Sequence, residues 1–243
     1  MSFRPRFSYT ESLMRDFGVI EAARAVIEVL PLPPDRIVRI RLEARERSTR
    51  NSTGIEGNTL EGREIGRAVV VAPAKPLNVM QQEVRNYWRA LEWIEEQIET
   101  NRLPSEEFIR ELHGIIIVRG QGRRGHLSEY RVRECPVVDT ATQVIDYAPP
   151  SPADVPKLMS ELVAWWREPA TALLPGPIRA GLLAHRFVSI HPFGDGNGRT
   201  ARALATAELW RSGYEMRGSR WDSLSTIMRG GMIPIIRRGS NSL

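Results

Sequence analysis

Residues 191–202 bring together almost every side-chain type that proteins use to handle nucleotides. They read His-Pro-Phe-Gly-Asp-Gly-Asn-Gly-Arg-Thr-Ala-Arg. The glycines Gly194, Gly196 and Gly198 permit backbone conformations that turn amide N–H groups toward an anion. A helix is predicted to begin directly after them, with an N-terminus that favours negative charge. The run therefore predicts a cradle for phosphate groups.

Each polar side chain in this run has a chemical use beside a phosphate. Asp195 can hold Mg2+ together with phosphate oxygens and water, and Asn197 can add a side-chain donor. Arg199 and Arg202 stand three residues apart on the predicted helix, so both guanidinium groups can face the same phosphates. His191 titrates near neutrality, which makes it the candidate general base for a hydroxyl nucleophile. Packing, turn formation and solvation explain each residue alone but not the whole set.

The rest of the chain must position this run, and its apolar residues mostly recur at helical spacing. The segments with this pattern are residues 19–30, 34–50, 84–101, 151–166, 177–189 and 199–211, and a further helix opens at Ser105. Two short β-prone stretches, 135–138 and 143–147, predict a hairpin that projects from the helical body. The sequence thus predicts an all-α bundle with one projecting β-hairpin.

Composition limits the class of protein. The chain has 243 residues and a net charge of +5, and all but two of its 34 basic residues are arginines. These arginines are scattered among acidic residues, which disfavours nucleic acid as the main ligand because such binding needs one face of like charge. The start lacks an apolar signal segment, no apolar run approaches the ~20 residues of a membrane span, and the single Cys135 suits a reducing compartment. We therefore expect a cytoplasmic protein with no membrane partner.

Other nucleotide and metal patterns fit less well. Residues 120–125 match G-x-G-x-x-G, but the residues after them do not open a helix, as a dinucleotide-binding unit requires. His113, His126 and His185 are isolated and lack the spacing of metal ligands. We expect packing or surface positions for these histidines, and no zinc site.

The run at 191–202 resembles the Fic family signature, His-Pro-Phe-x-[Asp/Glu]-Gly-Asn-Gly-Arg-x-x-Arg, and matches it at every defined position. The resemblance implies a Fic-type helical bundle in which the hairpin, at about 126–148, is the flap that binds a target protein. It also implies transfer of AMP from ATP to a Ser, Thr or Tyr hydroxyl. In that scheme His191 deprotonates the hydroxyl and Asp195 holds Mg2+. Residues 196–198 cradle the phosphates, Arg199 contacts them, and Arg202 clasps the γ-phosphate.

A second resemblance concerns residues 52–57. Ser52, Glu56 and Gly57 satisfy the family's inhibitory helix motif, [Ser/Thr]-x-x-x-Glu-[Gly/Asn], at a position before the signature. By resemblance, Glu56 pairs with Arg202 and takes the guanidinium that the γ-phosphate needs. In some relatives the same glutamate also helps to remove AMP from the target. Alone, this short motif equally fits a helix end capped by Gly57.

The expected organisation has three parts. Residues 1–103 form a helical region carrying the inhibitory helix at about 45–58, residues 104–213 form the catalytic core, and residues 214–243 form a tail of uncertain structure. Transfer of another phosphate-linked group, or nucleotide binding with little turnover, stays open as an alternative function. The target protein, the direction of the reaction and the presence of homo-oligomers also stay open.

Overall fold

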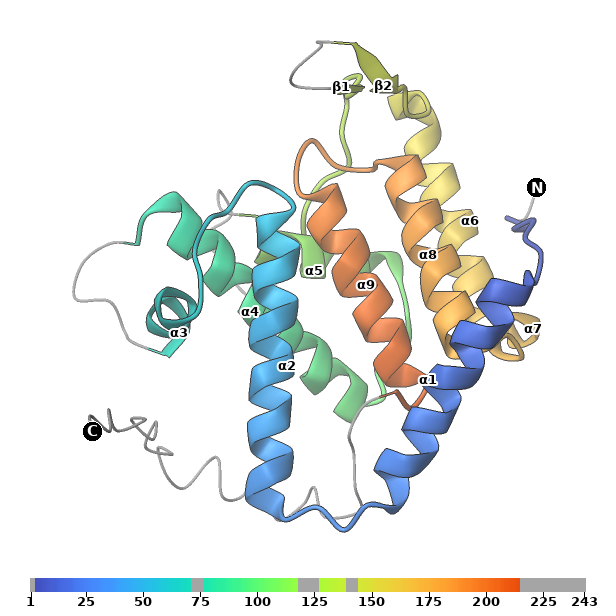
Figure 1. The fold of residues 1–243 in the computed structure, drawn as a ribbon. Coiled ribbons are helices and arrows are strands. Elements are labelled where there is room, and N and C mark those ends of the chain that lie inside the picture. Colours follow the sequence, from blue (N-terminus) through green and yellow to red (C-terminus); the bar gives the residue numbers. More distant parts are fainter. Residues whose placement is uncertain (1–2, 71–76, 118–126, 139–143, 215–243) are drawn as a thin grey trace.

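The computed structural model describes residues 3–70, 77–117, 127–138 and 144–214, and these are mostly helical (Figure 1). In chain order the helices are α1 (Glu11–Val29), α2 (Pro34–Gly54), α3 (Arg63–Val70), α4 (Val79–Glu99), α5 (Glu106–Ile116), α6 (Val155–Arg167), α7 (Pro169–Ala172), α8 (Gly176–Ile190) and α9 (Asn197–Arg211). Strands β1 (Val137–Val138) and β2 (Ile145–Tyr147) and a short 3-10 helix at Pro152–Asp154 lie between α5 and α6. The predicted all-α bundle with one hairpin is confirmed. Across these ranges, no helix combines the length and the apolar character needed to cross a bilayer.

Local sequence signals set several helix ends. Ser105 caps α5, as predicted, because its hydroxyl accepts a hydrogen bond from the Phe108 N–H. Helix α4 begins earlier than predicted, at a capping box in which the side chains of Asn78 and Gln81 each bond to the other's backbone N–H. Helix α2 continues past its predicted end near residue 50 as far as Gly54. Helices α3 and α7 were not predicted, because eight and four residues are too few to show a clear helical period.

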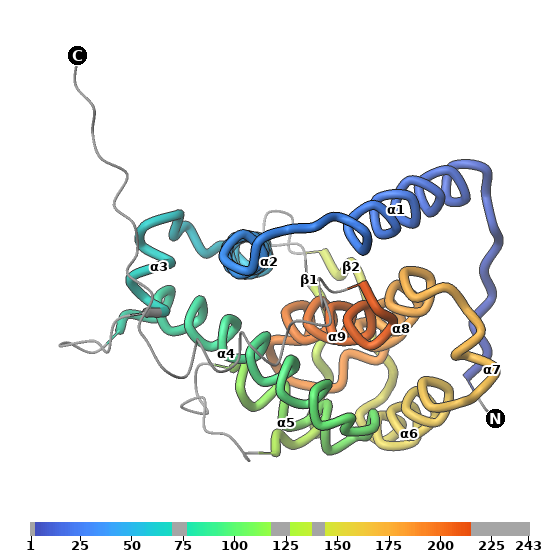
Figure 2. The backbone as a smooth tube through the Cα atoms, turned by 90° about the horizontal axis from the view of Figure 1, so that it is seen from below, coloured from blue at the N-terminus to red at the C-terminus, as the bar shows by residue number. Residues whose placement is uncertain are grey.

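The main core lies between α4, α5, α6, α8 and α9. Seen from below, the α8–α9 pair runs between α1 and α2 on one side and α5 and α6 on the other (Figure 2). Phe108 of α5 packs against Trp93 of α4 and Trp166 of α6, with ring centroids 4.8 and 6.0 Å away. Nε1 of Trp166 donates a hydrogen bond to the buried carboxylate of Glu208, which ties the last turns of α9 to α6. The core therefore fixes α9, whose first turns carry the predicted site.

Helices α1 and α2 lie outside this core. Helix α1 carries no buried residue. The buried residues of α2 are Val38, Thr49, Ser52 and Thr53, of which three are polar. Arg41 and Arg45 of α2 form ion pairs with Glu95 of α4. Ion pairs thus join α2 to α4, and the C-terminal end of α2 contacts α9 through Ser52.

The hairpin is short and projects beyond the loop that joins α8 to α9 (Figure 1). Val137 pairs with Tyr147 and Val138 with Ile145, in an antiparallel arrangement with an irregularity between the two pairs. The hydroxyl of Tyr147 donates a hydrogen bond of 2.7 Å to the Ser189 carbonyl, which ties β2 to α8. The expected turn at 139–142, the G-x-G-x-x-G run at 120–125, His126 and the tail from residue 215 lie outside the described residues.

Candidate active site

The predicted phosphate-binding run forms a loop between α8 and α9. Helix α8 ends at Ile190 and is capped by His191, whose backbone is left-handed (φ 50°, ψ 58°), and α9 begins after Gly196, which is also left-handed (φ 73°, ψ 8°). A left-handed conformation costs a non-glycine residue about 1–3 kcal/mol, so surrounding contacts must hold His191 in place. The N–H groups of the first turn of α9 have no acceptor within the helix, and they point toward this loop.

The side chain of Asn197 closes the loop. Its Oδ1 accepts a hydrogen bond from the Phe193 N–H at 3.0 Å, and its Nδ2 donates to the Phe193 carbonyl at 2.7 Å. Asn197 is only 2% exposed. These bonds engage Oδ1 and one of the two hydrogens on Nδ2, so the contact of this side chain with phosphate stays a prediction. In the structure Asn197 shapes the turn that presents backbone N–H groups.

His113 of α5 holds the middle of the loop. Its Nε2 lies 2.7 Å from the carbonyl oxygen of Asp195, and its Nδ1 lies 2.6 Å from the hydroxyl of Ser128. The ring stacks on Phe193 with centroids 3.7 Å apart. Because a carbonyl can only accept, Nε2 carries the proton and Ser128 donates to Nδ1. Burial is the largest cause that lowers the pKa of His113, to about 4, so the ring stays neutral in this network.

Arg199 occupies the first turn of α9, and its side chain is only 4% exposed. Its Nη1 lies 3.2 Å from Oε1 of Glu83 in α4, and its Nη2 lies 3.4 Å from Oδ1 of Asp195. Its Nε is buried and has no hydrogen-bond partner among the described residues. A buried guanidinium with an unused donor, beside a helix N-terminus, is suited to bind an anion.

Asp195 presents the carboxylate that the sequence predicts to hold Mg2+. Its side chain is 79% exposed, and its Oδ1 accepts a hydrogen bond of 2.6 Å from the Gly196 N–H. Within the described ranges, no three His, Cys, Asp or Glu side chains gather into a metal-binding group. A single exposed carboxylate beside a helix N-terminus fits Mg2+, which takes several of its ligands from phosphates and water.

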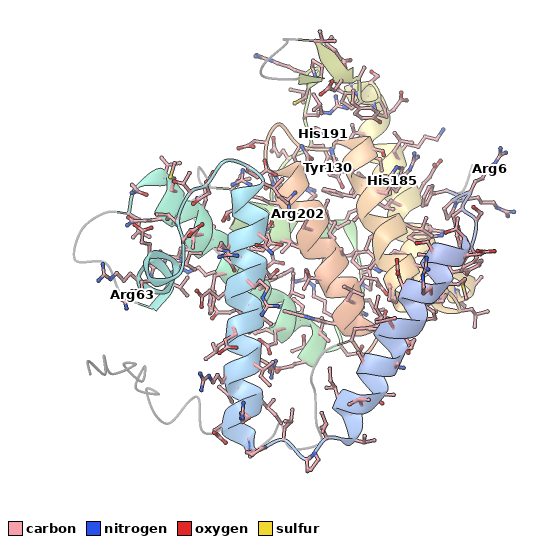
Figure 3. The ribbon with its side chains drawn as sticks, in the orientation of Figure 1. Arg6, Arg63, Tyr130, His185, His191 and Arg202 are labelled. Carbon is pink, nitrogen blue, oxygen red and sulfur yellow. The ribbon has the colours of Figure 1, made fainter. Side chains whose placement is uncertain are left out.

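His191 is half-buried, and Figure 3 shows it at the same end of the α8–α9 pair as Arg202. Its Nδ1 is buried. Burial lowers the pKa of His191, and the nearby charge of Arg131 lowers it further, whereas a backbone carbonyl and Glu56 act in the opposite direction. The net effect keeps the imidazole neutral at neutral pH and able to accept a proton.

Arg202 of α9 is held by the end of α2. Its Nη2 donates to Oε1 of Glu56 at 2.7 Å and to the Ser52 carbonyl at 2.9 Å, and its Nε donates to the Ser52 hydroxyl at 2.9 Å. A Cβ built on Gly198 would lie 2.6 Å from Oε1 of Glu56, so this carboxylate lies directly over the first turn of α9. Tyr87 of α4 supports Ser52 through a hydrogen bond between the two side chains. Burial raises the pKa of Tyr87, and this hydrogen bond opposes the rise.

The structure thus brings the sequence-predicted residues to one place. His191 to Gly198 form the loop and the helix start, Arg199 and Arg202 follow on α9, and Ser52 and Glu56 approach from α2. One boundary differs: α2 ends at Gly54, so Glu56 lies in the turn after the helix and not within it. Sequence reasoning missed three supporting residues, Glu83, Tyr87 and His113, because no local motif marks them.

Comparison with known proteins finds similarity to Fic proteins. Residues 103–209 match the Fic/DOC family model. A curated relative from Nematostella vectensis, named Protein adenylyltransferase Fic, is 30% identical over 218 residues, which cover 85% of this chain and 48% of the relative. A protein of the same name from Culex quinquefasciatus is 29% identical over 199 residues, which cover 77% of this chain and 38% of the relative. The chain spans less than half the length of these two relatives.

Solved structures share the fold. A Fic domain containing signaling protein from Bacteroides thetaiotaomicron superposes with a TM-score of 0.69 at 27% identity, over 88% of this chain and 79% of that protein. Fic-1 from Caenorhabditis elegans superposes with a TM-score of 0.65 at 24% identity, over 90% of this chain and 65% of that one, and shows likeness in fold. The part of the chain that matches the Fic/DOC family model, residues 103–209, includes the loop and the first turns of α9 described above.

Proposed function

We propose that this chain is a protein adenylyltransferase, which transfers AMP from ATP to a Ser, Thr or Tyr hydroxyl of a target protein. One observation carries the proposal: a single loop and the helix after it bring together a neutral histidine, an exposed carboxylate and two arginines beside the N–H groups of a helix N-terminus, which have no acceptor within the helix. The family domain and the names of the relatives support the same activity.

His191 acts as the general base. Because its Nδ1 is buried, Nε2 is the nitrogen that accepts the proton of the target hydroxyl. The hydroxyl oxygen then attacks the α-phosphorus of ATP. A new bond forms between this oxygen and the phosphorus, and the bond from the α-phosphorus to the oxygen bridging the α- and β-phosphates breaks. The products are a target carrying AMP and free pyrophosphate.

The start of α9 binds the triphosphate. The backbone N–H groups of residues 197–199 and the guanidinium of Arg199 hold the inner phosphates, and Arg202 holds the γ-phosphate. Asp195 faces solvent at the edge of this cradle, where it would hold Mg2+. When bound, Mg2+ would supply positive charge that offsets the negative charge of the phosphates. These contacts orient the α-phosphorus toward His191.

The hairpin presents the target. Ile145 and Tyr147 of β2 are 57% and 40% exposed. An extended target segment that pairs with the backbone of this short hairpin acquires a fixed register, which sets the distance of its hydroxyl from His191. The bond from Tyr147 to Ser189 keeps the hairpin close to the end of α8, which leads into His191.

Glu56 inhibits the reaction in this proposal. Arg202 cannot hold a γ-phosphate while its Nη2 is paired with Glu56, and the carboxylate itself repels phosphate from the first turn of α9. ATP then binds without its full set of contacts, in a pose that does not lead to transfer. Movement of the turn after α2 removes the inhibition.

Mass spectrometry tests the proposed function. The Glu56→Gly variant is incubated with Mg2+, a cell extract and one nucleotide at a time, and proteins are examined for a mass increase. We expect an AMP adduct with ATP that is lost in the Glu56→Gly, His191→Ala double variant. A uridylyl adduct or a bare phosphate would instead support another transfer reaction. Binding of ATP with no adduct on any protein would contradict enzymatic transfer.

A further inference from the structure

Arg131, which precedes the hairpin, joins three separate segments of the chain. Its Nε donates to the His191 carbonyl at 2.8 Å, its Nη1 donates to the Arg133 carbonyl at 3.2 Å, and its Nη2 donates to the Pro150 carbonyl. Its backbone N–H also donates to the Pro192 carbonyl at 2.9 Å. One residue therefore contacts the chain before the hairpin, the chain after it, and the start of the loop.

The guanidinium of Arg131 is a buried charge that is satisfied mainly by carbonyl oxygens. Its side chain is 3% exposed, whereas Glu134, 3.9 Å away, is 66% exposed and so offers a solvated partner. Burying a charge is costly unless hydrogen bonds compensate it. The planar guanidinium group has five N–H donors and can bond to three carbonyls at once, and a lysine ammonium cannot reproduce that geometry. The arrangement is therefore specific for arginine.

The contact with His191 lies at the strained point of the loop. His191 is left-handed, a conformation that a histidine keeps only where other contacts hold it. The bond from Arg131 Nε fixes the carbonyl of this residue, and the bond to the Pro192 carbonyl fixes the next peptide. Together they set the direction in which the His191 ring leaves the backbone.

We propose that Arg131 is a positioning residue that holds the main chain of His191 and the two chain segments that flank the hairpin in one fixed arrangement. The proposal rests on the adenylyl transfer proposed above. A target segment bound to the hairpin is then placed relative to the general base by the same guanidinium that orients the base. Loss of the Arg131 guanidinium lets the hairpin and His191 move independently, so the target hydroxyl is misplaced even when ATP is bound correctly.

Arg131 also acts on His191 through its charge. The charged groups that influence the His191 ring are Arg131, which disfavours its protonation, and Glu56, which favours it. Removing the charge at position 131 raises the pKa of His191, whereas replacing arginine by lysine keeps the charge and removes only the planar guanidinium group. Glutamine and lysine variants therefore separate the electrostatic effect from the geometric one.

Transfer kinetics in the Glu56→Gly background test the proposal, with Arg131→Lys and Arg131→Gln as variants. Arg211→Lys is the matched control, because the Arg211 guanidinium also donates to a backbone carbonyl, that of Arg102, but at the far end of α9. We expect Arg131→Lys to lower kcat by about tenfold or more, since small misplacements of reacting groups are costly. We expect KM for ATP to stay within about twofold and Arg211→Lys to leave kcat within about twofold.

The His191 ring provides a second measurement that does not depend on turnover. An NMR titration of its ring protons should give a higher pKa in Arg131→Gln and an unchanged pKa in Arg131→Lys. If Arg131→Lys retains kcat within about twofold, or if Arg211→Lys loses as much as Arg131→Lys, the positioning role is wrong. If the Glu56→Gly protein makes no adduct, the proposed function is wrong, and so is the proposal that Arg131 places a target. The NMR titration would still decide whether Arg131 acts on His191.

Discussion

Nη2 of Arg202 lies 2.7 Å from Oε1 of Glu56, although 146 residues separate the two in the chain. Both side chains are about one-third exposed, at 30% and 33%, so the pair sits at the mouth of the site and not in the core. An exposed ion pair contributes little to overall stability. Its consequence is local: the guanidinium that would bind a γ-phosphate already has a carboxylate partner.

Removing this partner should activate the enzyme. Loss of the carboxylate leaves the Arg202 guanidinium available to the γ-phosphate, so we expect Glu56→Gly to raise AMP labelling roughly tenfold. Ser52→Ala removes one of the two bonds that Ser52 makes with Arg202 and leaves Glu56 in place, so it should produce a smaller rise. Labelling is measured with ATP radioactive at the α-phosphate. Equal labelling of wild type and Glu56→Gly would exclude Glu56 as an inhibitor.

The pH dependence of transfer should follow His191. Burial is the main cause that lowers the pKa of His191 from its ordinary value of 6.5. The base must be neutral to accept a proton, so the rate should fall on acidification, with a midpoint below pH 6.5. The measurement is kcat/KM against pH for the Glu56→Gly variant, with a pH-stability check at each point. A midpoint above the ordinary histidine value would contradict the assignment.

His113 should make stability depend on pH. Its pKa is about 4 in the folded chain and 6.5 as the ordinary value, so the unfolded chain binds a proton more readily between these limits. The stabilisation from the neutral ring is complete above pH 6.5 and is lost as pH falls toward 4, amounting to roughly 3 kcal/mol. Denaturant unfolding of wild type and His113→Leu at several pH values should show a flatter profile in the variant. His185→Leu is the control, because His185 is exposed. If wild type and His113→Leu show the same dependence of unfolding free energy on pH, His113 does not cause it.

The left-handed backbone at position 196 should require glycine. Gly196 has φ of 73°, and an added Cβ would lie 3.2 Å from Ile117 and 3.4 Å from the His113 ring. We expect Gly196→Ala to destabilise the fold by about 1–2 kcal/mol. Gly181 of α8 has open space at the Cβ position and a helical backbone, so Gly181→Ala should be neutral or stabilising by up to about 1 kcal/mol. Thermal unfolding that ranks the two variants in the opposite order would contradict this account of the loop.

Much of the site could be predicted because its residues are consecutive. The spacing from His191 to Arg202 indicates a turn followed by a helix, and the structure has both. The helical class also follows from the apolar period, and Ser105 marks the start of α5 by a local capping bond. The loop-closing bonds of Asn197 to Phe193 could not be predicted, since the residue type allows several contacts and only the folded loop shows which partners lie within reach.

The supporting residues could not be predicted, for a physical reason. His113 bonds to the backbone carbonyl of Asp195, and a carbonyl is present at every residue, so it leaves no pattern in the sequence. Glu83 pairs with Arg199 across 116 residues, and any of the 29 acidic residues is an equal candidate from the sequence alone. Such long-range partners become visible only when the helices are packed.

The most direct test of the central claim compares the binding of ATP and ADP, since these ligands differ by the γ-phosphate alone. Isothermal titration with Mg2+ is carried out on wild type, Glu56→Gly, and Glu56→Gly with Arg202→Gln. Because Glu56 occupies Arg202 in the wild type, ATP and ADP should bind it with similar affinity. In Glu56→Gly, ATP should bind about tenfold more tightly than ADP, and Arg202→Gln should abolish this difference. An ATP preference that is the same in wild type and Glu56→Gly, or that survives Arg202→Gln, would contradict the account.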